Sequence, residues 1–448
     1  MIPSTLHFVR CDEVIGEIDW HEATREATDL LCRYIAVNTA NPPGNEALGA
    51  HFLSQVLAEN SIESEIYPVD ANRANMSARL TGDGSKRPLV LLNHIDVVPA
   101  ERQFWQEDPF AGVVRDGVIW GRGALDMKSM AVMELMTLLL LKRQGLPLKR
   151  DVIFLACADE EQGGINGIDW MDARHPELFD VEYVINEGGY GMTEMFGVKR
   201  PIFSCSVGEK GPLWLRLVAH GTPGHGSMPH DDNCLDRLVR ALYKVQNWRR
   251  PVTLLPEVAT MLKRLHSADI FQYEVSEKPL EKVAADNPLL RALLTDTVSA
   301  NVFQAGVKSN VIPAVAEATL DCRLLPGHDP ADFIEQVRQV IDDPAVEVEQ
   351  AMESHTPISP VDTELFAVVD AVTREAVPNA VVVPSIATGF TDSRVFRRRG
   401  VTAYGVALCL LEAAEIATVH GNDERIPIEK LGLGLRMLFE MVRRMCVE

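Results

Sequence analysis

Residues that could bind metal stand in five short polar segments of the sequence. They are His94 and Asp96 in NHID, Asp126 in GRGALDMKS, Glu160 and Glu161 in ADEEQ, Glu187 in INEGG, and His420 in TVHGNDE. Each of them alone fits a plainer role, because an acidic residue at a strand end is more often a helix cap or a solvated loop residue. Together they are harder to dismiss, since several carboxylates cannot share a small volume as anions without a cation among them. Imidazole and carboxylate are an ordinary ligand mixture for Zn²⁺.

The pattern also allows neighbouring carboxylates to take different roles, as metal ligand or as general base. One carboxylate can bridge two metal ions about 3.5–4 Å apart, as in two-metal hydrolases. A further glutamate must then stay off the metals to act as a base toward the attacking water. Glu160 and Glu161 offer both roles, because adjacent side chains leave the backbone in different directions.

The predicted elements place these segments at one edge of a sheet. Buried strands are expected at 88–98, 151–158 and 181–187, with helical spacing at 17–60 and at 127–144, where Gly145 ends the helix. Strands that alternate with helices in this way predict an α/β fold, a mostly parallel sheet with helices on both faces. Ligands of such sheets bind beyond the carboxyl ends of the strands, and that is where His94, Glu160 and Glu187 fall.

A different pattern begins near residue 208. The expected order is a strand at 211–221, a helix at 233–250, an antiparallel pair at 301–312 and 316–325, a helix at 330–343 and a strand at 345–353. This β-α-β-β-α-β order is typical of a ferredoxin-like α+β sandwich, and residues 250–300 add helical sequence to it. Strand and helix patterns return from about residue 355. We therefore predict a catalytic domain of residues 1–207 and 354–448, interrupted by a smaller domain of residues 208–353.

Length and composition narrow the class of protein. The chain has 448 residues, a formal charge of −21 and 46% hydrophobic residues, which fits a globular protein. The acidic excess disfavours binding to nucleic acid or to an anionic membrane. The longest apolar run, 130–141, contains Glu134 and is too short for a bilayer span. The opening MIPSTLHFVRCDEV lacks a secretory signal and the eight cysteines form no Cys-x-x-Cys pair, so we expect a cytoplasmic protein with reduced thiols.

Other signatures of hydrolases and nucleotide-binding proteins are missing. There is no His-Glu-x-x-His, no Gly-x-Ser-x-Gly and no Gly-x-x-x-x-Gly-Lys. The segments NHIDVVP, WGRGALDMK, DEEQGG, INEGG and TVHGNDE instead resemble the dinuclear zinc peptidases and deacylases. That family includes aminoacylase, carboxypeptidase S-like enzymes, acetylornithine deacetylase and succinyl-diaminopimelate desuccinylase. The resemblance covers nearly the whole chain and implies a catalytic α/β domain with an inserted lid, which commonly forms a dimer interface.

The resemblance also implies a role for each residue of the set. In the family pattern each zinc ion takes one histidine and one glutamate, and an aspartate bridges the two ions; here these are His94 with Glu187, Glu161 with His420, and Asp126. Glu160 would be the general base and later the acid. Asp96 would orient the first histidine through its second ring nitrogen. Co²⁺ or Mn²⁺ could replace Zn²⁺, because mixed nitrogen and oxygen ligands accept all three.

The interrupting domain and a later loop contribute further implied residues. His225 in GTPGHGSMPH resembles the family histidine that reaches the active site of a partner subunit and stabilises the oxyanion; taken alone, it would be a turn residue without a role. Asn310 and Arg323 resemble lid positions that hold the carboxylate of the substrate, and the planar fork of arginine suits this task. Gly389 and Thr391 in ATGFTDSRVF resemble a loop that hydrogen-bonds the substrate backbone.

These features predict hydrolysis of an amide or peptide bond next to a free carboxylate. The substrates would be N-acyl amino acids or short peptides, and the enzyme a deacylase, carboxypeptidase or dipeptidase that forms a homodimer through its lid. Glu187 favours the aminoacylase, deacylase and carboxypeptidase branches, because relatives that cleave carbamoyl groups carry histidine there and several dipeptidases carry aspartate. The alternative is a non-catalytic relative that binds a peptide or amino acid and assembles through its lid. Such a relative is expected to have lost Glu160 or a metal ligand, and none is lost here.

Overall fold

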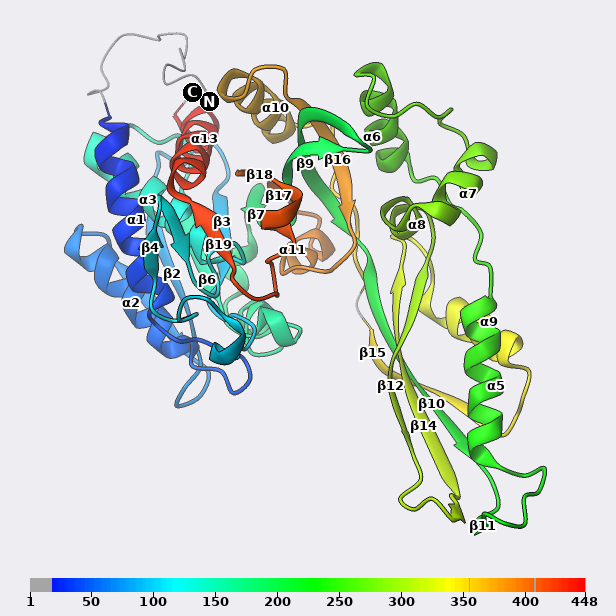
Figure 1. Ribbon diagram of the computed structural model, residues 1–448. Coiled ribbons are helices and arrows are strands. Elements are labelled where there is room, and N and C mark those ends of the chain that lie inside the picture. The colour runs from blue at the N-terminus through cyan, green and yellow to red at the C-terminus, as the bar shows by residue number, and fades with distance from the viewer. Residues whose placement is uncertain (1–17, 354, 407, 448) are drawn as a thin grey trace.

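The computed structural model describes residues 18–353, 355–406 and 408–447. Figure 1 shows two lobes, a broad one in which helices surround a large sheet and a narrow one that extends away from it. The narrow lobe is built of β10 (Gly211–His220), α5 (Cys234–Asn247), β12 (Thr297–Ala305), β14 (Val315–Leu324), α9 (Pro330–Ile341) and β15 (Val346–Glu353). The predicted fold class, an α/β domain interrupted by a smaller α+β domain, is confirmed.

The largest sheet among the described residues has ten strands. Their order is β1 (Ser64–Pro68), β2 (Ala74–Leu80), β6 (Val152–Cys157), β3 (Leu89–His94), β7 (Tyr183–Asn186), β17 (Thr402–Val406), β9 (Val198–Glu209), β8 (Gly191–Met195) and β18 (Leu410–Leu411), with β16 (Val381–Ala387) paired to β9. The centre of the sheet, from β6 through β3 and β7 to β17, is parallel. On one side of this centre, β2 is antiparallel to β6 and β1 is antiparallel to β2. On the other side, β9 is antiparallel to β17.

Helices cover both faces of this sheet, as expected. Alternate residues of β3 point to opposite faces: Leu89 and Leu91 lie in one hydrophobic core, and Val90 and Leu92 lie in another. The first core contains residues of α1 (Trp20–Ile35), α2 (Glu46–Glu59), α3 (Lys128–Gln144), α10 (Glu364–Ala376) and α13 (Ile428–Cys446). The second contains residues of α4 (Ile168–Arg174), η3 (Pro176–Phe179) and α11 (Ser393–Arg398).

The helix α3 passes through the interior of the broad lobe. Its residues from Lys128 to Leu141 are all buried, which explains why apolar residues surround this helix instead of forming one stripe. It ends at Gly145, whose φ of 60° is the left-handed conformation that glycine adopts without strain. Because α3 begins at Lys128, Asp126 lies two residues before its first turn, at the edge of the sheet.

The narrow lobe has the predicted ferredoxin-like arrangement. Its strands lie in the order β12, β14, β10, β15, and every neighbouring pair is antiparallel. Buried and less buried residues alternate along β14, and the buried ones pack with α5 and α9 in a core of their own. At the far tip, β11 (Gly224–His225) pairs with β13 (Val311–Ile312).

The helical sequence between residues 250 and 300 forms three helices that belong to the core of the broad lobe. They are α6 (Pro256–Ser267), α7 (Glu277–Asp286) and α8 (Pro288–Leu294). Val258 and Leu262 of α6 and Leu290 of α8 are buried in the core of the large sheet. The chain therefore passes from the narrow lobe back to the broad one before β12. Strand β9 of the large sheet ends at Glu209 and β10 of the small sheet begins at Gly211, and the domain limits at 207 and 353 stay a prediction.

Short elements complete the broad lobe. They are a three-stranded sheet of β19 (Arg425–Pro427), β5 (Val118–Trp120) and β4 (Val113–Arg115), the 3-10 turns η1 (Arg102–Phe104) and η2 (Glu160–Gln162), and α12 (Ala413–Ile416). None of the helices in the described ranges is both long enough and apolar enough to cross a bilayer. The opening segment MIPSTLHFVRCDEV, on which the expected location partly depends, lies outside the described residues.

Candidate metal centre

Six of the predicted residues converge at the carboxyl edge of the large sheet. They are His94 at the end of β3, Glu160 and Glu161 after β6, Glu187 after β7, Asp126 before α3, and His420 after α12. Three neighbouring parallel strands thus deliver side chains to one edge, as the rule for such sheets predicts. We call these six residues the edge cluster.

Asp126 lies between the two histidines of the edge cluster. Its Oδ1 lies 3.1 Å from Nε2 of His94, and its Oδ2 lies 2.9 Å from Nε2 of His420. Oε1 of Glu187 lies 3.6 Å from Nε2 of His94, and Oε1 of Glu161 lies 3.3 Å from Nε2 of His420. Each oxygen of the aspartate therefore faces one histidine–glutamate pair, the arrangement that a ligand shared between two ions requires.

Burial and the crowding of like charges raise the pKa of the three glutamates. Glu160 and Glu187 have pKa values well above the usual carboxyl range, first because water is excluded and then because other carboxylates lie close. Burial is also the main reason why the pKa of Glu161 is raised. The three side chains resist carrying negative charge together unless positive charge lies among them.

The histidines and Asp126 respond to the same crowding. The pKa of His420 is raised to about 10, first by its contact with Asp126 and then by Glu161. Burial lowers the pKa of His94, but Glu187 and Asp126 outweigh this and leave it well above its usual value. Burial alone would raise the pKa of Asp126, yet the two histidines hold it below the ordinary value. Four carboxyl groups stand against two imidazoles in the edge cluster, and their shifted pKa values show that they are too crowded to ionise together without added positive charge.

The edge cluster fits two divalent cations. Ligand atoms of His94, Asp126 and Glu161 lie within 4.8 Å of one another, and so do those of His94, Glu160 and Glu187. Oε1 of Glu161 is buried but makes no hydrogen bond within the described residues, as expected of an oxygen that serves a cation. Imidazole nitrogen and carboxylate oxygen are donors that Zn²⁺ and related ions accept.

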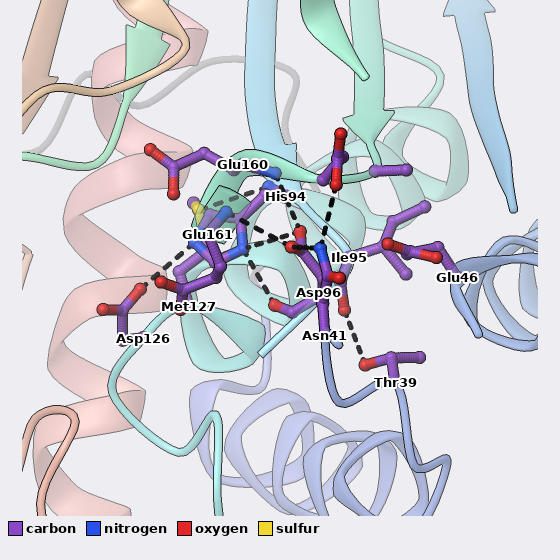
Figure 2. A network of polar contacts seen from close by, with 12 residues as sticks. Thr39, Asn41, Glu46, His94, Ile95, Asp96, Asp126, Met127, Glu160 and Glu161 are labelled. Atoms are coloured by element: carbon purple, nitrogen blue, oxygen red, sulfur yellow. Dashed lines mark hydrogen bonds and ion pairs between the residues drawn. The ribbon is translucent and has the colours of Figure 1, made fainter. Parts of the chain in front are cut away.

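Asp96 holds the turn that carries the two adjacent glutamates. Its buried carboxylate accepts hydrogen bonds from the backbone N–H groups of Glu160 and Glu161, both at 3.2 Å, and from Nδ2 of Asn41 at 2.9 Å (Figure 2). Nδ1 of His94 lies 2.9 Å from the backbone carbonyl oxygen of Asp96 and 3.6 Å from its carboxylate. The second ring nitrogen thus meets Asp96, with the carbonyl as the nearer acceptor. This contact directs Nε2 toward Asp126.

A further layer of polar residues, which the sequence analysis did not single out, supports Asp96. Nδ2 of Asn41 also donates to Asp159 at 3.0 Å, and Arg73 donates to Asp159 and to Oδ1 of Asn41. Asp159 has a φ of 67°, so its backbone turns sharply between β6 and Glu160. Asp159 adjoins the predicted glutamates in the sequence, whereas Asn41 and Arg73 come from distant loops whose local sequence carries no signal for this role.

Glu187 packs against a glycine of the neighbouring strand. A Cβ atom added to Gly405 in β17 would lie 2.3 Å from the carbonyl oxygen of Glu187. Only glycine allows this approach of the two backbones. The conformation at the end of β7 therefore depends on a residue more than two hundred positions further along the chain.

His225 and Asn310 lie at the tip of the narrow lobe, far from the edge cluster (Figure 1). His225 belongs to β11, and Asn310 directly precedes β13. Nδ1 of His225 accepts a hydrogen bond from the backbone N–H of Ser227 at 3.2 Å. The ten residues of β10, at ~3.3 Å each, separate the tip from the base of the lobe by roughly 30 Å. A single chain does not bring His225 to the edge cluster.

Arg323 lies at the opposite end of the narrow lobe, where it meets the broad one. It stands near the end of β14, and its Nε donates to Oδ1 of Asp321 at 2.7 Å. Its guanidinium carbon lies 5.4 Å from the ring centre of Phe390, which stands between Gly389 and Thr391 in the sequence. The structure thus brings Arg323 and the predicted backbone-binding loop together, and it separates both from Asn310.

A buried ion pair anchors the loop that carries Thr391. Oε2 of Glu209 accepts hydrogen bonds from the hydroxyl of Thr391 at 2.8 Å and from its backbone N–H at 3.2 Å. The same oxygen lies 3.0 Å from Nη1 of Arg397, and the two side chains of the pair are 0% and 1% exposed. Gly389 is exposed, and a Cβ there would meet no atom within 4 Å. The hydroxyl of Thr391 is thus bound within the protein, and the open side of the loop is at Gly389.

The fold and the edge cluster define a metal-dependent hydrolase. Residues 90–444 match peptidase family M20/M25/M40, and the chain belongs to this family. It is 28% identical over 380 residues to the N-fatty-acyl-amino acid synthase/hydrolase PM20D1 of Homo sapiens, covering 81% of this chain and 74% of that protein. It is 31% identical over 365 residues to a probable carboxypeptidase S-like 2 of Dictyostelium discoideum, covering 78% and 69%.

A solved structure has the same fold. It is the M20 family metallo-carboxypeptidase Sso-CP2 from Sulfolobus solfataricus, with a TM-score of 0.74, 20% sequence identity, and 93% of this chain and 98% of that chain covered. The predicted family and enzyme class are confirmed: the protein is a hydrolase of amide or peptide bonds in the M20/M25/M40 family of peptidases. These findings favour the enzyme over the non-catalytic alternative.

Proposed function

We propose that the protein hydrolyses the amide bond of N-acyl amino acids or short peptides that carry a free α-carboxylate, with two Zn²⁺ ions held by the edge cluster. The observation that carries this proposal is the position of Asp126, whose two oxygens face two separate histidine–glutamate pairs. The relatives support the bond type, because one is named for N-fatty-acyl amino acids and the other for carboxypeptidase activity. Both names describe an amide bond beside an amino-acid carboxylate.

The residues of the chain divide the work of the reaction. His94 with Glu187 and His420 with Glu161 would each hold one ion, with Asp126 between them. When bound, the two ions acidify a water molecule and polarise the scissile carbonyl. Glu160 would assist the remaining steps, and Asp96 would hold Glu160 in position.

Glu160 would move the proton. Glu160 is 8% exposed, and one of its carboxylate oxygens lies within 4.8 Å of ligand atoms of His94 and Glu187. It would take a proton from the attacking water and pass it to the leaving nitrogen. Asp96 fixes the position of this base, because it binds the backbone N–H of Glu160.

Arg323 is the candidate for binding the carboxylate of the substrate. Asp321 occupies its Nε and Nη2, but its Nη1 is buried and makes no hydrogen bond within the described residues. The guanidinium also lies beside the ring of Phe390, which restricts its orientation. A free donor on an oriented arginine suits a carboxylate ligand.

A substrate panel on the zinc-loaded protein tests the proposed function, with released amine as the readout. N-acyl amino acids and peptides with a free C-terminus are expected to be cleaved, and the same compounds with an amidated C-terminus to be cleaved poorly. Glu160→Gln should lower kcat by about 10²–10⁴-fold. Glu59→Gln, a control at an exposed helix end, should not. Equal cleavage of free and amidated substrates, or full activity of Glu160→Gln, would contradict the proposal.

We also propose that the protein acts as a homodimer through the narrow lobe, in which His225 of one subunit serves the edge cluster of the other. The support is the distance of the lobe tip from the edge cluster and the position of β12 at an edge of its sheet. Val302 and Phe303 on β12 are 45% and 48% exposed, and an exposed apolar edge strand tends to pair with another chain.

Mixing two inactive variants tests this arrangement. In a mixed dimer of Glu160→Gln and His225→Ala, one site combines an intact Glu160 with an intact His225 from the other subunit. Random exchange should therefore restore about a quarter of the wild-type activity, as two-fold symmetry requires. If His225 acts within its own chain, mixing restores nothing, and if His225 has no role, His225→Ala alone keeps the activity of the wild type; either result would contradict the arrangement.

The remaining expectations concern location and partners. We propose a cytoplasmic protein that binds neither nucleic acid nor membranes, supported by its formal charge of −21 and by cysteines without a Cys-x-x-Cys pair. Cell fractionation with an antibody against the native protein tests this, and recovery in a secreted or membrane fraction would contradict it.

A further inference from the structure

One carboxylate outside the edge cluster holds two of its segments together. Glu424 is 0% exposed, and its two oxygens accept hydrogen bonds from four donors within residues 122–126, shortly before α3. Oε1 accepts the backbone N–H groups of Leu125 at 2.7 Å and Asp126 at 3.0 Å. Oε2 accepts the backbone N–H of Gly123 at 3.1 Å and Nη1 of Arg122 at 2.7 Å. Four donors therefore occupy this carboxylate, which leaves it no role as a metal ligand.

Arg122 continues the connection to the segment that carries His420. Its Nη2 donates to the carbonyl oxygen of Gly421 at 2.8 Å, one residue after His420. The guanidinium carbon lies 5.1 Å from the ring centre of Trp105, and the side chain is 3% exposed. Arg122 thus contacts both the carboxylate of Glu424 and the backbone beside a predicted metal ligand.

Neighbouring contacts join the same two segments. The backbone N–H of Gly121 donates to the carbonyl oxygen of Glu424 at 2.9 Å. Immediately beyond, β19 pairs with β5, with Arg425 opposite Trp120. The loop that carries Asp126 and the loop that carries His420 are therefore fastened at a strand pair and, closer to the edge cluster, at the Arg122–Glu424 pair.

We propose that the Arg122–Glu424 pair is a positioning device for the metal centre, which sets the spacing between Asp126 and His420. This proposal rests on the proposed function, because it assumes that the edge cluster binds two ions. A shared ligand must meet both ions, so a shift of about 0.5 Å between the two loops is enough to weaken the geometry. The ion held by His420 and Glu161 depends on this spacing, whereas the ion held by His94 and Glu187 is anchored on strands of the sheet.

The burial of the pair fits this role. Arg122 neutralises a carboxylate that stands next to a cluster already rich in negative charge, and the hydrogen bonds to charged groups are stronger and more directional than neutral ones. Residues that orient metal ligands in this way usually change metal affinity by about 10–100-fold when they are replaced. Because Arg122 also fastens the backbone beside His420, which serves only the second ion, loss of the pair should weaken the second ion far more than the first.

The test uses the full-length protein freed of metal and titrated with Co²⁺ alone, followed by calorimetry and by the visible absorption of the bound ion. The wild type should bind two equivalents. Glu424→Gln keeps the shape of the side chain but places an amide N–H₂ against N–H donors, and Arg122→Met removes the contact with Gly421. Each is expected to weaken the second equivalent by about 10–100-fold, to change its absorption spectrum, and to leave the first equivalent within about threefold of the wild type.

Glu415→Gln is the matched control. Glu415 lies five residues before His420, contacts Lys430 at 2.5 Å and accepts a backbone N–H from Glu412 at 2.6 Å, but it holds no part of the loop before α3. It should bind both equivalents as the wild type does. Should Glu424→Gln fail to fold, Arg122→Met and Arg122→Lys carry the test, with partial recovery expected for the lysine.

The outcomes separate this proposal from the proposed function. If the wild type binds two ions and hydrolyses its substrates while Glu424→Gln and Arg122→Met bind both ions with unchanged affinity and spectrum, only the positioning role is refuted. An equal loss at both equivalents refutes it too, because that result indicates general damage to the fold. If the wild type binds fewer than two ions, the proposed function fails with it.

Discussion

The strongest effect on stability is expected from Arg397→Met. This replacement removes the cation from the buried pair with Glu209, whose Oε2 lies 3.0 Å from Nη1 of Arg397. It also removes the hydrogen bond from Nε to the carbonyl oxygen of Ala403 at 3.1 Å. The carboxylate would remain buried with only Thr391 as its donor among the contacts described above.

The magnitude follows from the burial of the pair. Breaking a buried ion pair by removing one partner costs about 3–5 kcal/mol, because an uncompensated charge stays in the interior. The adjacent Arg398 offers a matched control: its Nη2 lies 2.8 Å from Oδ1 of Asp169, but the two side chains are 38% and 36% exposed. Arg398→Met should therefore cost below about 1 kcal/mol.

Urea unfolding followed by tryptophan fluorescence measures both variants. The double variant Arg397→Met with Glu209→Gln should regain part of the loss, because it removes the unpaired charge. Two results would refute the reasoning: equal losses for Arg397→Met and Arg398→Met, or a double variant no more stable than Arg397→Met. We also expect Arg397→Met to raise KM more than it lowers kcat, since the pair anchors the loop of Thr391 and not the edge cluster.

Three further outcomes are expected. Removing metal with a chelator should lower the melting temperature, and an ion restored at 1,000 times its Kd should return about 4 kcal/mol of unfolding free energy. Scanning fluorimetry measures the melting temperature, and an unchanged value would contradict a metal centre. Burial lowers the pKa of Lys210 from 10.5 to about 7, so the unfolded chain binds this proton more tightly and stability should rise by about 1.4 kcal/mol per pH unit between those two values. In Lys210→Met the urea midpoint should lack this part of its rise with pH. An equal rise in the wild type and in Lys210→Met would count against the prediction. Leu215→Ala in the core of the narrow lobe should cost about 2–5 kcal/mol, whereas Leu48→Ala, at a leucine that is 58% exposed, should stay within about 0.5 kcal/mol; similar denaturation midpoints for the two would speak against a packed core there.

Elements with a strong local pattern could be predicted from the sequence. The run around Leu89 predicted β3 because both of its faces are buried, and such strands are apolar throughout. The end of α3 at Gly145 followed from the one residue type that adopts its φ of 60° without strain. The βαββαβ order of the narrow lobe followed from the alternation along its strands.

Pairings between distant segments could not be predicted in the same way. The position of β17 between β7 and β9 is set by which strands meet across the sheet, and no local periodicity specifies the neighbour of a strand. The helices between residues 250 and 300 are amphipathic, but the sequence does not say which core receives their apolar faces. The structure assigns them to the broad lobe.

The candidate site shows the same limit. His94 and Glu187 could be placed because both end predicted strands, and the carboxyl ends of parallel strands share an edge. Glu424 belongs to the segment TVHGNDE, which marks His420 as a candidate ligand. Its own role, however, depends on hydrogen-bond donors about three hundred residues away. The sequence carried no sign of that contact, because hydrogen bonds between loops leave no repeating pattern.

The position of β17 between β7 and β9 has a consequence for the nascent protein. Roughly 300 residues separate His94 from His420, and a ribosome adding ~5–20 residues per second needs at least about 15 s to span them. Until β17 emerges, β7 lacks the neighbour that joins it to β9, and the edge cluster lacks its second imidazole. The proposed metal centre is therefore complete only late in synthesis, after His420 has been added, and a product that stops before β17 would leave an edge of β7 unpaired.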